Sequence, residues 1–259
     1  MAQIGVPCAL LGSAFMLNPG TTLKKTRKKS EMPGNLVDRA YHLTLDQILR
    51  GELPLGAVVS RRSLAEQFGM SFIPVTGALQ RLERDGLLES RPRAGTRVKI
   101  PTADEARGRF EMREALECQS ARLCAERSTL QERLDLKRSA EQMDVLSART
   151  AANGLDKELR FAEQTYHTEL HMKIAVYARS ESLRAALENM HVLVFNWLYN
   201  TVTGGMVLPE GFHQQLIEVI VSGDPEAAEA AMRAHVQYGA ANVLRAVSPE
   251  SNGRWRARR

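Results

Sequence analysis

The chain has little cysteine, few aromatic residues and no alternating polar and apolar pattern of useful length. Its 259 residues include 3 cysteines, and no Cys-x-x-Cys pair occurs. A disulfide scaffold is therefore excluded, and we expect a reduced, cytoplasmic protein with buried or incidental thiols. Aromatic residues make up 5% of the sequence, which is typical of a mainly helical protein.

The chain also lacks a hydrophobic run long enough to cross a membrane. Residues 4–17 are apolar, but a stretch of about 14 residues is too short to span the hydrocarbon layer. The basic run KKTRKK at residues 24–29 follows this stretch, whereas a secretory signal places its charges first. We therefore expect no membrane partner, a disordered leader over residues 1–34 and a frayed tail over residues 248–259.

Positive charge is concentrated in the first part of the chain. The net charge is +5, yet residues 1–99 carry 15 Lys and Arg against 8 Asp and Glu, and the remainder carries 20 against 22. A solubilising surface would not need this asymmetry. Attraction to nucleic-acid phosphates is the simplest reason for it.

Residues 60–98 have the order of a winged helix-turn-helix, with two amphipathic helices, a tight turn between them and a basic hairpin. Leu64 and Phe68 lie four residues apart and share one face of the first helix. Gly69 accepts the left-handed conformation that ends a helix, and Ser71 is a favourable N-cap for the second helix. The pattern therefore predicts a module that places a helix in a DNA groove.

The second helix would present one face to the major groove, and strands at residues 87–90 and 96–100 would form a wing beside it. Gly77 on that face would allow the backbone to approach the DNA closely. The alternative is a structural helix pair with a solvated basic loop. The residues that we expect to contact DNA are Arg61, Arg62, Ser71, Phe72, Thr76, Gln80, Arg91, Arg93 and Arg97.

A dense set of short motifs extends this pattern over residues 36–100. The motifs are Gly51-Glu52-Leu53, Leu64-Ala65-Glu66, Gly69-Met70-Ser71, Pro74-Val75, Ala78-Leu79, Leu82 and Gly86-Leu87-Leu88. With them the stretch resembles the DNA-binding domain of GntR family transcriptional regulators. Members of this family usually carry arginine where this chain has Phe72 and Thr76. The resemblance thus implies a DNA operator, and these two departures imply an operator of unusual sequence.

After residue 102 the helical period continues almost without interruption. We expect an N-terminal winged helix-turn-helix domain over residues 35–100 and an all-α bundle of six to seven helices over residues 103–247, a mainly α fold. The expected helices span residues 103–128, 130–150, 155–178, 181–203, 209–222 and 225–247.

Two stretches of this helical part carry a second resemblance. They are MREALECQSARLCAER at residues 112–127 and VLPEGFHQQLIEVIVSGDPEAAEAAMRAHV at residues 207–236. Both resemble the FCD domain, the helical ligand-binding domain of the FadR subfamily. The resemblance implies a homodimeric regulator, most often a repressor, whose helical domain binds a small organic acid. Arg113 matches a family arginine that would bind an effector carboxylate, and a surface ion pair with Glu117 is the alternative.

The resemblance also implies a metal site. In metal-binding FCD domains an aspartate and three histidines hold a divalent ion, and the matching residues here are Glu163, His167, His213 and His235. One carboxylate and three imidazoles suit Zn, Ni, Mn or Fe. Because glutamate replaces the family aspartate, its longer side chain would shift the metal, weaken its binding or leave the site without a metal.

Two other functions remain open. The first is a metal-dependent enzyme built on the helical domain, although His167-Thr168-Glu169-Leu170-His171 lacks the glutamate that a zincin helix has directly after its first histidine. The second is a regulator that senses the metal itself without an organic effector. We expect a regulator that is not an enzyme.

Overall fold

The computed structural model describes residues 35–91, 95–153, 156–189 and 208–247. The described part is mainly helical, with one small antiparallel sheet, as the sequence predicts. The chain divides into two compact units, residues 1–99 and residues 100–259. The leader, the tail and Arg93 of the wing lie outside the described residues.

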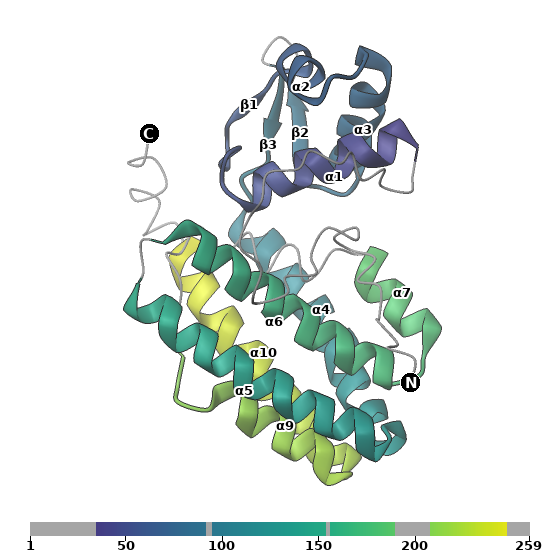
Figure 1. Cartoon of the computed structure of the whole chain (residues 1–259), viewed down its shortest axis with the longest axis vertical. Helices are drawn as coiled ribbons and strands as arrows, with labels where there is room; N and C mark the ends of the chain where they lie inside the picture. The colour runs from purple at the N-terminus through teal and green to yellow at the C-terminus, as the bar shows by residue number, and fades with distance from the viewer. Residues whose placement is uncertain (1–34, 92–94, 154–155, 190–207, 248–259) are drawn as a thin grey trace, which may run out of the picture. The chain divides into compact units, whose positions relative to one another are not determined.

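The first unit is a helix-turn-helix with a three-stranded sheet (Figure 1). Its elements are α1 (Leu36–Leu49), β1 (Val58–Val59), α2 (Arg61–Phe68), α3 (Phe72–Arg84), β2 (Leu88–Arg91) and β3 (Gly95–Val98). The strands lie in the order β1-β3-β2, with Leu88 opposite Val98 and Val58 opposite Arg97. The sequence predicts β2 and β3 but not β1, because two residues are too few to show an alternating pattern.

The turn between α2 and α3 forms as its residue types require. Gly69 ends α2 in the left-handed conformation at φ 63°, and Ser71 occupies the N-cap of α3 without a side-chain capping hydrogen bond. Ser60 caps α2, since its hydroxyl accepts a hydrogen bond from the Ser63 backbone N–H at 3.2 Å. Val75 and Leu82 belong to a buried stripe on α3 that packs within the unit.

Gly77 on α3 has a different role from the one that its position in the sequence suggests. A Cβ atom at Gly77 would lie 3.3 Å from the Val37 side chain of α1. The missing side chain therefore lets α1 and α3 pack closely, and the prediction that Gly77 opens the backbone to DNA is wrong. Arg81 reinforces the same contact, because it pairs with Asp38 of α1 at 3.0 Å.

The second unit is a bundle of long helices. These are α4 (Ala103–Arg127), α5 (Leu130–Ala152), α6 (Lys157–Tyr177), α7 (Glu181–Asn189), α9 (Phe212–Ser222) and α10 (Pro225–Val247). Figure 1 shows α5 beside both α6 and α9, and α4 packs against α6 and α10. The predicted ranges agree with these helices to within about three residues, except that residues 190–203 of the predicted fourth helix lie outside the described residues. Helix α9 starts later than expected because Gly211 is left-handed, at φ 66°.

Both described cysteines of this unit lie in its interior. Cys118 and Cys124 are free and buried, and burial raises the pKa of their thiols to about 11 and about 12. They are therefore protonated at neutral pH and unreactive, as expected for incidental thiols.

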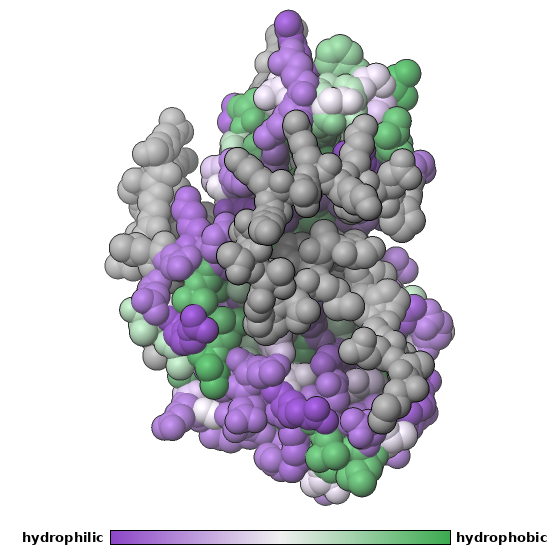
Figure 2. All heavy atoms as spheres, in the orientation of Figure 1, coloured by the Kyte–Doolittle hydropathy of each residue, from purple (hydrophilic) through white to green (hydrophobic). Residues whose placement is uncertain are grey.

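The surface is predominantly hydrophilic on the face seen in Figure 2, with separate hydrophobic patches. No described helix is both long and apolar enough to cross a bilayer.

Candidate metal centre and DNA-binding surface

Three histidines from three helices meet inside the second unit. One imidazole nitrogen from each of His167, His213 and His235 lies within 4.8 Å of the other two. The ring centroids of His213 and His235 are 5.3 Å apart, and those of His167 and His213 are 5.4 Å apart. Helices α6, α9 and α10 thus bring together residues that are far apart in the sequence.

The nitrogens of this triad fit a metal ion. Nδ1 of His167, Nε2 of His213 and Nδ1 of His235 are buried and make no hydrogen bond to the residues that the structure describes. A buried polar atom without a partner is unfavourable, and a metal ion would satisfy all three nitrogens at once. Three imidazoles suit Zn, Ni or Fe, and geometry would choose among these metals.

The environment keeps two of these rings in the form that binds metal. Burial holds the pKa of His167 and of His235 well below the usual value, and the neighbouring His171 adds to the effect. Neutral imidazole is the form that coordinates a metal. The triad is therefore prepared for a cation at neutral pH.

Asp144 of α5 holds the His213 ring in one orientation. Its Oδ1 lies 2.7 Å from His213 Nδ1 and accepts a hydrogen bond from the His213 backbone N–H at 3.0 Å. A ring that donates from Nδ1 keeps Nε2 as the unprotonated ligand atom. Burial would raise the pKa of Asp144, but its hydrogen bonds with His213 and Gln214 lower it overall. The sequence gives no signal for this contact, because the two residues are 69 positions apart and lie on separate helices.

Glu163 is not grouped with the triad, so the structure brings together three of the four residues of the predicted metal site. Glu163 lies one turn before His167, but its carboxylate is not part of the cluster. It lies beside the hydroxyls of Ser147 and Thr150 on α5, and His213 is close enough to influence its pKa. Burial raises the pKa of Glu163 and these hydroxyls lower it, so the net shift is upward.

Arg113 forms a buried ion pair rather than the surface pair considered above. Its Nε donates to Glu117 Oε1 at 2.6 Å, and both side chains are almost fully buried. Burial would raise the pKa of Glu117, but Arg113 and His171 overcome this effect and lower it to about 2. The Arg113 guanidinium is therefore engaged by a carboxylate of its own helix.

His171 connects this ion pair to the triad. Its Nδ1 lies 2.5 Å from Glu117 Oε2, and its ring centroid is 4.4 Å from that of His167 and 5.1 Å from that of His235. The sequence offers His171 only as an unmatched histidine, four residues after His167. Its burial and its contact with Glu117 become visible only in the fold.

Most of the expected DNA contacts that the structure describes are exposed. Among them, Arg61, Arg62, Ser71, Phe72, Gln80 and Arg91 are exposed, and Thr76 and Arg97 are half-buried. Three of the arginines also hold local partners. Arg62 pairs with Glu66 at 3.0 Å, Arg91 pairs with Glu89 at 2.9 Å, and Arg97 donates to the Gly56 carbonyl at 3.3 Å. The exposed ion pairs of Arg62 and Arg91 should contribute little to stability, so both arginines could exchange their partners for phosphate.

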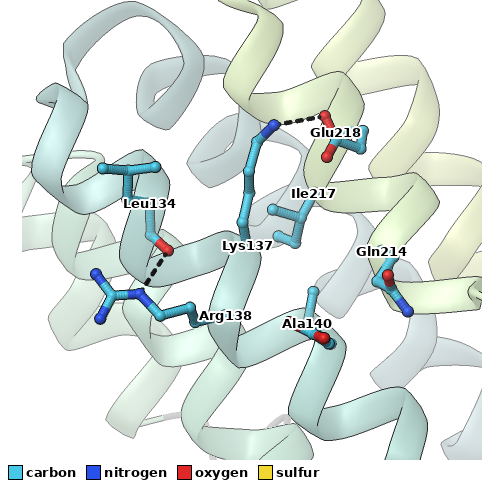
Figure 3. A pocket seen from close by; sticks show the side chains of 8 residues that line it. Leu134, Lys137, Arg138, Ala140, Gln214, Ile217 and Glu218 are labelled. Carbon is cyan, nitrogen blue, oxygen red and sulfur yellow. Dashed lines mark hydrogen bonds and ion pairs between the residues drawn. The ribbon is translucent and has the colours of Figure 1, made fainter.

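A separate hollow of about 260 Å³ lies between α5 and α9 (Figure 3). Lys137 and Glu218 pair there at 2.9 Å, and Arg138 donates to the Leu134 carbonyl. Gln214 lines the hollow and also donates to Asp144 at 3.2 Å. Since these polar groups bond to one another, we do not assign the effector to this hollow.

Two family models match this chain. The model described as "Bacterial regulatory proteins, gntR family" matches residues 36–98, and the "FCD domain" model matches residues 109–238. The chain belongs to the GntR family. It is a DNA-binding transcriptional regulator with an FCD domain, and the helix-turn-helix and the histidine triad lie in the two matched regions.

Relatives of this GntR family member are regulators from several bacteria. It is 31% identical over 192 residues to a Paenarthrobacter nicotinovorans protein named "Probable D-xylose utilization operon transcriptional repressor", which covers 73% of this chain and 80% of the relative. It is 25% identical over 202 residues to the "HTH-type transcriptional repressor RspR" of Escherichia coli (strain K12), with coverages of 76% and 84%.

Solved structures share the fold of this GntR family member. A GntR transcriptional regulator from Rhodococcus sp. RHA1 superposes with a TM-score of 0.65 at 19% identity, over 81% of this chain and 98% of the other. McbR/YncC of E. coli gives a TM-score of 0.64 at 20% identity, over 83% of this chain and all of the other, 100%.

Proposed function

We propose that this GntR family member is a cytoplasmic, homodimeric repressor that responds to a small organic acid through a divalent metal. The observation that carries the proposal is the triad of His167, His213 and His235, whose buried nitrogens lack partners among the described residues. Relatives named as repressors support the direction of regulation.

The first unit would bind the operator DNA. Two copies of the winged helix-turn-helix in a dimer would bind two half-sites related by a two-fold axis. We propose Arg61, Arg62 and Arg91 as phosphate contacts, because they are exposed and basic. Arg93 and Arg97 of the wing, and Ser71, Phe72, Thr76 and Gln80 of α3, would complete the contact.

The triad would supply the metal site. His167, His213 and His235 would hold the ion, and Asp144 would fix the orientation of His213. The ion would provide a positive centre that attracts a carboxylate in a buried site. Glu163 would act beside the site rather than as a ligand.

Arg113 would release Glu117 and bind the effector carboxylate in its place. In the structure Glu117 satisfies the Arg113 guanidinium at 2.6 Å. We propose that the effector carboxylate competes with Glu117 for Arg113, and that His171 transmits the change because it contacts both Glu117 and the triad. Differential binding of the effector to two arrangements would shift the population that binds DNA.

A second candidate is a regulator that senses the metal itself. The pairing of Arg113 with Glu117 favours it, because a guanidinium that is already engaged is a weaker clamp for an added carboxylate. In this case the metal alone would change the affinity for DNA. The relatives are transcriptional regulators, and we propose no catalytic step.

The test is DNA affinity measured by fluorescence anisotropy with the full-length protein and the DNA beside its own gene. We expect binding to weaken steeply as salt rises, since phosphate contacts release counterions. Addition of Zn²⁺ or Ni²⁺ together with a panel of organic acids should then lower the affinity.

His213→Ala should abolish the response, and His42→Ala, which removes a histidine of the first unit, should leave it intact. A response to metal without any acid supports the second candidate. Binding that is insensitive to salt, or a response that survives in His213→Ala, would contradict the proposal.

A further inference from the structure

The first turn of α3 exposes two large apolar side chains. Ile73 is 82% exposed and Phe72 is 58% exposed, whereas the next two residues, Pro74 and Val75, are buried. The buried face of α3 thus begins at Pro74, and the side chains of Phe72 and Ile73 before it remain in solvent. Side chains this exposed contribute little to the stability of the unit, so their apolar character calls for a partner.

The position of the pair indicates what that partner is. Residues at the N-terminal end of the second helix of a helix-turn-helix reach base edges in the major groove. Exposed arginines of the same unit, Arg61, Arg62 and Arg84, make a polyanion a better occupant than an apolar protein surface. DNA therefore covers this pair more readily than a second protein would.

The chemistry of the side chains selects among base pairs. Phenylalanine and isoleucine cannot hydrogen-bond to base edges, and the thymine 5-methyl is the apolar group that the major groove offers. Farther along the same helix, Thr76 is half-buried and Gln80 is exposed. Thr76 carries a methyl group, and a glutamine side chain can bind adenine N6 and N7 together.

We propose that Phe72 and Ile73 read thymine 5-methyl groups and that Gln80 reads an adenine farther along the same half-site, so that each half-site is built on A·T base pairs. The inference rests on the proposed function, because it requires that α3 enters the major groove. It goes further by naming the bases and the chemical group that α3 recognises.

The experiment starts with selection of sites from a random duplex DNA library by the full-length protein. A·T pairs should dominate the positions that α3 contacts. Each thymine is then replaced by deoxyuridine, which removes only the methyl group. We expect about fourfold weaker binding for each methyl that is lost from a contact, the value for one buried methylene. A 5-methylcytosine at these positions should bind better than unmodified cytosine.

Substitutions test whether Phe72 and Ile73 cause the preference for thymine. Phe72→Ala and Ile73→Ala should each reduce the preference for thymine over deoxyuridine, and both together should remove it. Both residues are exposed, so these variants should fold. Val58→Ala is the matched control, because Val58 is 56% exposed in β1 of the same unit and should keep the preference.

Salt-sensitive, sequence-selective binding with equal affinity for thymine and deoxyuridine would overturn the inference and leave the proposed function standing. Selected sites that lack A·T pairs would do the same. Failure to bind any DNA selectively would overturn both.

Discussion

Glu117 is a buried carboxylate held in its ionised form by a buried arginine. It contacts Arg113 of its own helix α4 at 2.6 Å and His171 of α6 at 2.5 Å. A buried charge of this kind is stable only while its partner is present. Removing one member of the pair should therefore be strongly destabilising.

We expect Glu117→Gln to destabilise the protein by roughly 3 to 5 kcal/mol, since it leaves Arg113 charged and buried without its carboxylate. Glu218→Gln is the control, because it breaks the exposed pair with Lys137 and should cost about 1 kcal/mol or less. Urea unfolding at neutral pH measures both changes. A loss in Glu117→Gln no larger than in the control would contradict the buried pair.

The lowered pKa of Glu117 leads us to predict that the stability of the protein depends on pH. The pKa of this carboxylate is about 2 in the folded protein against an ordinary value of 4.5, so the unfolded chain binds the proton more tightly. Its contribution to stability is present above about pH 4.5 and is lost as the pH falls toward about 2. The difference in unfolding free energy between the native protein and Glu117→Gln should narrow over this range.

The contact of Asp144 with His213 leads us to predict a change in metal affinity when Asp144 is replaced. Asp144→Asn removes the anionic partner of His213 Nδ1, and we expect divalent metal to bind about 10 to 100 times more weakly. Asp135→Asn is the matched control on the same helix, because Asp135 pairs with Lys173 and not with the triad. Calorimetric titration with Zn²⁺ measures both, and equal affinities would contradict the role of Asp144.

At the scale of the residues, the sequence locates the imidazoles but not the groups that orient them. His167, His213 and His235 are predictable because each matches a family position. The contacts of Asp144 with His213 and of Glu117 with His171 join separate helices, and no helical spacing encodes them. The surroundings of Glu163 depend on the fold in the same way, since the hydroxyls of Ser147 and Thr150 beside it come from α5.

At the scale of the elements, helix ends depend on groups that come from other helices. Gly211 begins α9 without a side-chain cap, and Asp144 of α5 accepts hydrogen bonds from the backbone N–H groups of His213 and Gln214 instead. A carboxylate near a helix N-terminus is stabilising. Asp144 thus fixes α9 and the metal-binding ring together.

The contact between α1 and α3 gives a prediction at this scale. Gly77→Leu should destabilise the first unit by about 1 to 3 kcal/mol, because its Cβ alone would already lie 3.3 Å from Val37. Val37→Ala in the same chain should recover part of the loss. Thermal unfolding measures both variants.

Gly108→Leu is the matched control for a glycine within a helix. A Cβ atom at Gly108 of α4 would meet no described atom within 4 Å, so this change should be neutral or stabilising. An equal loss at Gly77 and Gly108 would show that helix packing is not the cause.

The ends of the helices were largely predictable, because capping residues and glycines close to each end determine where a helix starts and stops. Thr102 and Thr129 begin α4 and α5 with capping boxes, and Gly69 ends α2. The two-residue strand β1 was not predictable, since it exists only through pairing with β3. Local chemistry therefore predicts where elements begin and end, while their pairing depends on the fold.

At the scale of the whole molecule, the basic DNA-binding module and the candidate metal site belong to different units. The first carries the basic surface and the recognition helix, and the second carries the histidine triad. A regulator needs both parts, because binding at one must change affinity at the other. Sequence resemblance predicts this division, but it cannot predict whether the residues of the metal site actually meet.

The measurement that tests the account most directly is divalent metal binding by the full-length protein after treatment with a chelator. Titration with Zn²⁺, followed by elemental analysis, should give one ion per chain, with loss of that ion in His167→Ala, His213→Ala and His235→Ala. Glu163→Gln and His42→Ala should retain it, because neither residue belongs to the cluster. Absence of binding, or binding that persists in the three triad variants, would contradict the account.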